Sequence, residues 1–230
     1  MSRHISSAGR TRMLDKIRKA LDDGSGSPAR RQAVEARLAR PPVHLQPARN
    51  DKPHEGLVEQ LRQFLEGQSA TVLDVATREG VPQAVSGWLR QHNLPQRVRT
   101  GTDPWLASLP WSGAASLERT IGPATLTDDV GVSRARAGIA ETGTLVLTSG
   151  ADNPVTVTFL PENHVVVLEA KDVVGSYEQA WVTVRAALGT AGMSRTVNFV
   201  SGPSRTGDIG GKLVMGAHGP RRLCVVLVRG

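Results

Sequence analysis

Apolar residues recur at helical spacing in five stretches of the chain. The clearest is residues 55–67, where Leu57, Leu61 and Leu65 belong to one apolar stripe. The same spacing occurs over residues 10–22, 31–39, 81–91 and 171–188. The pattern predicts a helix in each of these stretches.

Short apolar runs between these stretches predict β-strands. The expected strands are residues 70–75, 96–100, 115–118, 139–148, 165–169, 197–200 and 223–228. Residues 101–114 contain two Pro-Trp pairs and are expected to form a loop. Helices that alternate with short strands predict an α/β domain, with a mixed or parallel sheet and helices on both faces.

The segment between the last two expected strands favours a further helix. Ser201-Gly202-Pro203-Ser204 is typical of a turn, and Thr206 is a suitable N-cap for a helix that continues through Met215. Residues 216–220, Gly-Ala-His-Gly-Pro, would end that helix. A strand–loop–helix–strand unit is therefore expected, and the start of its helix would present backbone N–H groups to an anion.

Composition divides the chain into an arm and a body. Glycine, serine and proline between residues 24 and 28, followed by four prolines up to residue 53, predict a helical arm and linker over 1–50 and a compact domain over 51–230. Residues 1–40 hold 10 Lys and Arg against 4 Asp and Glu, and the rest holds 18 against 17. The arm therefore carries most of the net positive charge. Three roles are open for it: docking on a partner subunit, lying on an anionic surface, or forming a solvated arm with no partner.

Several classes of protein are disfavoured by what the chain contains. Only 8 aromatic residues occur, which argues against a base-stacking nucleic-acid surface. The sequence contains no long apolar run and no signal-peptide core. We therefore expect a cytoplasmic protein with no membrane span. The single cysteine, Cys224, excludes an internal disulfide and is too few for an iron–sulfur cluster, so it is interpreted as a buried strand residue.

The loop of residues 201–208 is the first candidate site. In α/β sheets, ligands bind beyond the carboxyl ends of the strands, and this loop follows a predicted strand. The residues expected to bind an anion are Ser201, Gly202, Ser204, Arg205, Thr206 and Asp208. Arg205 would hold a carboxylate or phosphate through two hydrogen bonds. The alternative is a helix packed on the sheet, with Arg205 paired to an internal acid.

A second candidate site begins at Glu141. Thr142, Gly143 and Thr144 stand at a strand entrance, where a glycine suggests a bulge or exposed backbone N–H groups that bind a ligand. Glu141 would then act as a general base or nucleophile. The alternative is that Glu141 caps local backbone groups.

Neither the histidines nor the common catalytic and nucleotide-binding motifs identify a further site. His164 precedes a strand and is a possible member of the crevice, whereas His218 is expected at the opposite end of the sheet from Ser201. No metal-ligand spacing occurs, so no metal site is predicted. The P-loop, nucleophile-elbow and dinucleotide-binding patterns each lack a required residue.

The candidate segments together resemble one protein family. Ile139–Leu147, Pro161 with His164-Val165, Ser201–Ile209 and Gly216–Pro220 are similar to motifs of the lactate-utilisation protein C family, the LUD-domain proteins. The resemblance covers roughly residues 125–228. It departs at Gly210, where the family usually has Glu.

The resemblance implies a fold and two functions. The fold would be that of the ribose-5-phosphate isomerase, CoA-transferase and formyltetrahydrofolate cyclo-ligase group. The first function is an accessory, cluster-free component of L-lactate oxidation to pyruvate. It would have no cofactor of its own and would bind an anionic metabolite or an iron–sulfur partner protein. The alternative is a stand-alone transferase or isomerase for an acyl-CoA, carboxylate or sugar phosphate, with Glu141 in the mechanism.

Overall fold

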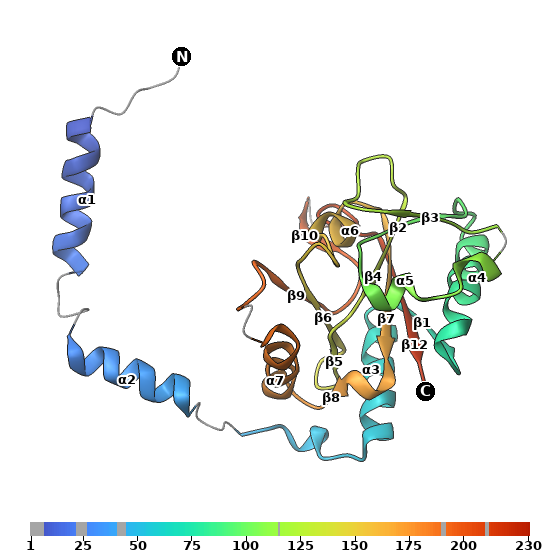
Figure 1. Cartoon of the computed structure of the whole chain (residues 1–230), viewed down its shortest axis with the longest axis horizontal. Coiled ribbons are helices and arrows are strands. Elements are labelled where there is room, and N and C mark those ends of the chain that lie inside the picture. Colours follow the sequence, from blue (N-terminus) through green and yellow to red (C-terminus); the bar gives the residue numbers. More distant parts are fainter. Residues whose placement is uncertain (1–6, 22–26, 41–44, 115, 190–191, 210–211) are drawn as a thin grey trace. The chain divides into compact units, whose positions relative to one another are not determined.

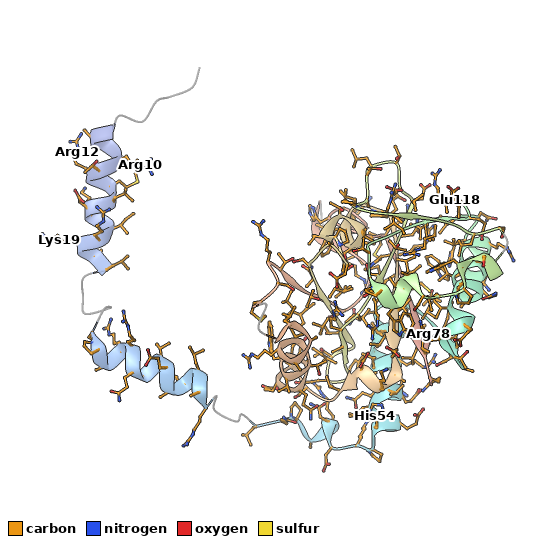
Figure 2. All side chains as sticks on the ribbon, in the orientation of Figure 1. Arg10, Arg12, Lys19, His54, Arg78 and Glu118 are labelled. Atoms are coloured by element: carbon orange, nitrogen blue, oxygen red, sulfur yellow. The ribbon has the colours of Figure 1, made fainter. Side chains whose placement is uncertain are left out.

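A computed structural model describes residues 7–21, 27–40, 45–114, 116–189, 192–209 and 212–230. Its contacts divide the chain into two units, Met1–Leu45 and Gln46–Gly230. The first unit contains two helices, α1 (Ser7–Leu21) and α2 (Pro28–Ala39), and the Ser27 hydroxyl caps the second. Figure 2 shows the side chains of Arg10, Arg12 and Lys19 projecting from α1.

The second unit is built on a six-stranded parallel sheet in the order β1-β12-β7-β4-β2-β3 (Figure 1). Its strands are β1 (Thr71–Val75), β2 (Arg97–Thr100), β3 (Glu118–Ile121), β4 (Val130–Arg134), β7 (Asn163–Glu169) and β12 (Arg222–Val228). The neighbouring inner strands β7 and β12 are buried almost throughout. Continuous apolar runs of this kind are typical of parallel strands that are covered on both faces.

A second, mostly antiparallel sheet has the order β8-β5-β6-β9. Its strands are β5 (Ala137–Ile139), β6 (Thr144–Thr148), β8 (Val173–Val174) and β9 (Val197–Val200). The strands β10 (Arg205–Ile209) and β11 (Lys212–Met215) pair with each other as an antiparallel ribbon. The chain therefore leaves the second sheet at β9 and joins the first sheet at β12, between β1 and β7.

Three apolar cores hold the layers of the body together. On one face of the six-stranded sheet, α4 (Val81–Gln91) buries Val85, Trp88 and Leu89. On the other face, α3 (His54–Gly67) buries Leu61 and Leu65 between the two sheets. The outer face of the second sheet is covered by α7 (Tyr177–Leu188). Figure 1 shows this succession, from α7 across both sheets to α4.

Short helices complete the body. They are α5 (Pro104–Ala107), α6 (Val155–Phe159), η1 (Ala48–Asn50), η2 (Arg78–Gly80), η3 (Trp111–Gly113) and η4 (Ala170–Asp172). Among the residues that the structure describes, no helix is both long enough and apolar enough to cross a membrane.

The α/β architecture predicted from the sequence is confirmed, and so are most of its helices and strands. The strand expected at 223–228 is confirmed as β12, but the prediction of a helix between Thr206 and Met215 is wrong. Residues 205–209 and 212–215 form the β10–β11 ribbon rather than a helix, so Thr206 is not an N-cap and pairs with Val214. The flanking strands β9 and β12 belong to different sheets.

Other differences concern the ends of elements. The expected helix over 171–188 begins at Tyr177, where Ser176 and Gln179 form a capping box, and η4 and β8 come before it. The expected strand over 139–148 is a hairpin, β5 and β6, with a turn between them. The strand expected at 115–118 is replaced by β3, which begins at Glu118, and residue 115 lies outside the described residues. Neither β4 nor α6 was predicted.

Candidate functional site

A pocket of about 270 Å³ opens where the loop after β9 meets the turn before β12. We call it the Ser201 pocket. Its lining residues are Thr158, Phe159, His164, Phe199, Val200, Ser201, Gly202, Pro203, Ser204, Arg205, His218, Gly219, Pro220 and Leu223. This described wall contains hydroxyl, imidazole, guanidinium and apolar groups, and it contains no carboxylate.

The position of the pocket differs from the expected one. His164 and Leu223 are the second residues of β7 and β12, so the pocket lies at the amino ends of these parallel strands. The crevice was predicted at their carboxyl ends. The prediction requires residues 197–200 to be a strand of the same parallel sheet, whereas β9 runs antiparallel to β6 in the second sheet.

Two segments that are separate in the sequence are joined at the pocket. The Ser204 N–H donates to the Pro220 carbonyl at 2.8 Å, and the Gly216 N–H donates to the Ser204 carbonyl at 2.9 Å. The His218 N–H also approaches the Ser204 hydroxyl at 3.4 Å. The prediction that His218 lies at the opposite end of the sheet from Ser201 is therefore wrong, because the β10–β11 ribbon returns the chain to its starting point.

Arg205 is held at the pocket by neutral partners. Its guanidinium donates to the Ser69 hydroxyl at 2.9 Å, to the Gln68 side-chain oxygen at 3.2 Å and to the Gln68 carbonyl. Within the described side chains, no carboxylate pairs with it, unlike the internal acid of the alternative interpretation. Its positive charge is therefore available to an anion in the Ser201 pocket.

His164 forms the deep wall of the pocket. It is 1% exposed, and its Nε2 lies 3.0 Å from the Ser133 hydroxyl of β4. Burial lowers the pKa of His164 to about 3, because the imidazolium would lose its hydration. The side chain is therefore a neutral imidazole near pH 7, with one nitrogen that donates and one that accepts.

The Ser201 hydroxyl belongs to a cluster of four hydroxyl groups. The Thr144 hydroxyl, which is fully buried, lies 2.7 Å from the Ser201 hydroxyl and 2.7 Å from the Thr142 hydroxyl. The Tyr177 hydroxyl lies 3.0 Å from that of Thr142 and 3.2 Å from that of Thr144. We call these four groups the hydroxyl cluster. It connects the two candidate segments, with only Ser201 in the pocket wall.

Glu141 and Gly143 lie apart from the pocket. The Glu141 carboxylate accepts from the Asn50 side chain at 3.4 Å and lies 3.9 Å from the Arg49 guanidinium. Gly143 has φ +67°, and a Cβ there would lie 2.4 Å from the Phe64 Cβ on α3. This glycine is needed for the close approach of the turn to α3. Neither residue lines the described pocket.

The predicted site residues thus separate into groups. His164, Ser201, Gly202, Ser204 and Arg205 line the pocket. Thr142 and Thr144 reach it through the hydroxyl cluster. Thr206 lies on β10 and does not line the pocket. The side chain of Asp208 and the whole of Gly210 lie outside what the structure describes.

The sequence did not point to several of the pocket residues. Phe159 and Phe199 of the pocket wall, and Tyr177 of the hydroxyl cluster, carried no motif, because an aromatic residue on an apolar face looks like an ordinary core residue. His218 had a signal, the Gly-Ala-His-Gly-Pro turn, but the supposed helix placed it elsewhere. In the described parts of the chain, no three His, Cys, Asp or Glu side chains gather closely enough to hold a metal ion.

The LUD domain family model matches residues 53–228, which include every strand of the body. The chain belongs to the LUD-domain family. A solved structure that it resembles is that of a DUF162 family protein from Deinococcus radiodurans, at a TM-score of 0.59 and 21% identity. The alignment covers 77% of this chain and 99% of that one. This likeness supports the LUD fold of the body.

Curated relatives of this LUD domain carry a functional name. "Lactate utilization protein C" of Shouchella clausii is 32% identical over 111 residues, which are 48% of this chain and 48% of the relative. A protein of the same name from Bacillus licheniformis is 28% identical over 176 residues, 76% of this chain and 68% of the relative. The chain spans about half the length of the first of these relatives.

Proposed function

We propose that this LUD protein serves in lactate utilisation, as the cluster-free component of a system that oxidises L-lactate to pyruvate. Relatives named lactate utilization protein C support the metabolic role. The Ser201 pocket would bind a small anionic metabolite of this system.

The observation that carries the proposal is the chemistry of the pocket wall. The Arg205 guanidinium has no carboxylate partner among the described side chains, and hydroxyl groups of Ser201 and Ser204 stand beside it. A carboxylate ligand would gain hydrogen bonds to a charged donor there, which are stronger than those between neutral groups. A volume of about 270 Å³ suits a small molecule rather than a polymer.

The oxidation itself would need partner proteins. We propose that iron–sulfur proteins supply the redox centres and that this chain has no cofactor of its own, since its one cysteine cannot hold a cluster. The test is deletion of the gene in its native host, together with purification of the tagged protein. We expect poor growth on L-lactate and recovery of an iron–sulfur partner. Normal growth without such a partner would contradict the role.

Binding by the pocket can be tested separately with purified protein. The Arg205→Gln variant should bind L-lactate at least about tenfold more weakly, because it loses a charged hydrogen-bond donor. Arg90→Gln is the matched control, since Arg90 bonds to Ser116 and does not line the pocket. Calorimetric titration of the three proteins measures the difference. Equal affinities for all three would place the anion elsewhere.

The stand-alone enzyme is the second candidate, with Glu141 as base or nucleophile. The partly buried carboxylate, 17% exposed, favours it. The position of Glu141 beside Asn50 and Arg49 favours a structural role instead. Turnover by the purified chain that disappears in Glu141→Gln would support the enzyme. Turnover that persists in this variant would remove Glu141 from the mechanism.

A further inference from the structure

The hydroxyl cluster contains as many protons as hydrogen bonds. Each of the four hydroxyl groups has one proton to donate and two lone pairs to accept with. Four O···O contacts of 2.7–3.2 Å join them: Thr142 to Thr144, Thr142 to Tyr177, Thr144 to Tyr177, and Thr144 to Ser201. All four contacts can be hydrogen bonds only if every proton is used inside the cluster.

This count decides the direction of the bond at Ser201. The contacts among Thr142, Thr144 and Tyr177 form a closed ring, and the ring uses all three of its own protons in either sense of rotation. The fourth bond must then use the Ser201 proton, so Ser201 donates to Thr144. If Thr144 donated to Ser201 instead, one bond of the ring would be lost.

We infer that Tyr177 is a specificity-determining residue, because it closes the ring that fixes Ser201 as a hydrogen-bond acceptor toward the pocket. The pocket then selects an anionic ligand that carries an O–H or N–H donor beside its carboxylate. It discriminates against the analogue with a carbonyl oxygen at that position, since two acceptors would face each other. This inference rests on the proposed anion pocket and adds the ligand class that it prefers.

The surroundings of the ring support this role. Thr144 is fully buried, and among the described residues its hydroxyl has no hydrogen-bond partner outside the cluster. Tyr177 is the first residue of α7, whose capping box through Ser176 fixes the start of the helix. Its ring also packs against Phe199 at 5.5 Å between centroids. The phenol is therefore positioned from two sides and acts on the ligand only through Thr144 and Ser201.

A matched pair of probes tests the inference. L-Lactate and pyruvate share a carboxylate and a carbon skeleton, and they differ in a hydroxyl against a carbonyl at the second carbon. The wild-type protein should bind L-lactate about 3- to 10-fold more tightly, the range expected for one neutral hydrogen bond. Tyr177→Phe keeps the aromatic packing and opens the ring, so Ser201 can donate or accept equally well. Its preference should fall to within about twofold, mainly through tighter pyruvate binding.

A second variant and a control make the result decisive. Thr142→Val opens the same ring from another side and should give the same loss of preference. Thr183→Val is the control, because its hydroxyl lies on α7 and bonds to the Gln179 carbonyl outside the cluster. It should keep the wild-type preference.

Three results would overturn the inference. They are no binding of either probe, equal affinities in the wild-type protein, and a preference that survives both Tyr177→Phe and Thr142→Val. The growth and purification experiment decides the lactate role independently, so the inference can fail while the proposed function stands. A thermal melt of each variant confirms that it is folded before its affinities are compared.

Discussion

His164 illustrates how burial sets the chemistry of a single residue in this protein. Its pKa is lowered from 6.5 to about 3 by loss of hydration. Between these two values the unfolded chain binds a proton at this residue and the folded chain does not. The free energy of unfolding therefore falls as the pH falls through this window, by about 1.4 kcal/mol per pH unit for one proton.

A substitution at this position should change the acid sensitivity of the fold. Replacing His164 by Gln removes the titrating group, so the free energy of unfolding should decrease less steeply between about pH 6 and pH 4. Urea titrations at a series of pH values measure the slope. Ser133→Ala is the control, because it removes the hydroxyl partner and leaves the imidazole buried, so the wild-type slope should remain. Equal slopes in all three proteins would contradict the prediction.

Cys224 is the other residue whose burial has a chemical consequence. It is fully buried on β12, and burial raises the pKa of its thiol well above the usual range. A neutral, inaccessible thiol reacts slowly, so we expect no labelling by a thiol reagent in the folded protein. One equivalent should react after denaturation. Rapid labelling under native conditions would show that β12 is accessible.

At the scale of elements, the contact between β4 and α6 supports the pocket wall. A Cβ on Gly131 would lie 2.1 Å from the Val157 carbonyl, and the two residues after Val157 on α6 line the pocket. Gly131→Ala should therefore push α6 outward and lower the free energy of unfolding by about 1–3 kcal/mol, as overpacking does. At roughly 2–4 °C per kcal/mol, calorimetry would detect the shift in melting temperature.

Gly87 provides the matched control for this substitution. It lies inside α4, and a Cβ there would meet nothing within 4 Å. Gly87→Ala should stabilise the protein by roughly 0.5–1 kcal/mol, because alanine favours the helical backbone. If both glycine variants changed stability in the same direction, the close approach of α6 to β4 would not be the cause.

The ribbon of β10 and β11 shows why one element was predicted wrongly. Leu213, Val214 and Met215 fit either a helix or a strand, because short apolar runs do not distinguish the two by periodicity. The three glycines at 207, 210 and 211 each disfavour a helix by roughly 1 kcal/mol, and Gly-Gly between two runs is also a hairpin signal. Thr206, which is a suitable helix N-cap, favoured the helix over this hairpin signal.

At the scale of the whole molecule, the positive charge is separated from the body. The arm up to residue 40 holds 10 Lys and Arg against 4 Asp and Glu, whereas the rest is nearly balanced. We expect the full chain to retard duplex DNA in low salt and to release it as salt rises, because such binding depends on counterion release. A fragment of residues 46–230 should not retard it. A gel-shift titration with both proteins checks this.

The same fragment tests whether the body is independent. It keeps Arg49 and Asn50, which contact Glu141, and it includes all three apolar cores. We expect its melting temperature to equal that of the full chain within about 2 °C, since the contacts separate the units at residue 45. A lower melting temperature would mean that the arm stabilises the body.

The sequence by itself determined the α/β class, most helices, the buried strands β7 and β12, and the family. Local periodicity is sufficient for these features, because it reports which face of an element is buried. It also indicated the pocket loop through Ser201, Ser204 and Arg205. Polar and charged residues directly after an apolar strand indicate a candidate site even when their tertiary contacts are unknown.

Only the tertiary structure decided which strands share a sheet and which side chains meet. β1 pairs with β12 through Thr71 and Cys224, and this distant pairing leaves no local pattern in either strand. The same applies to Ser201, which contacts Thr144 and lines one pocket with His218, and to Glu141, which faces Asn50 instead of the pocket. Hydrogen bonds between distant segments depend on how whole layers pack, so the site was assembled by the fold.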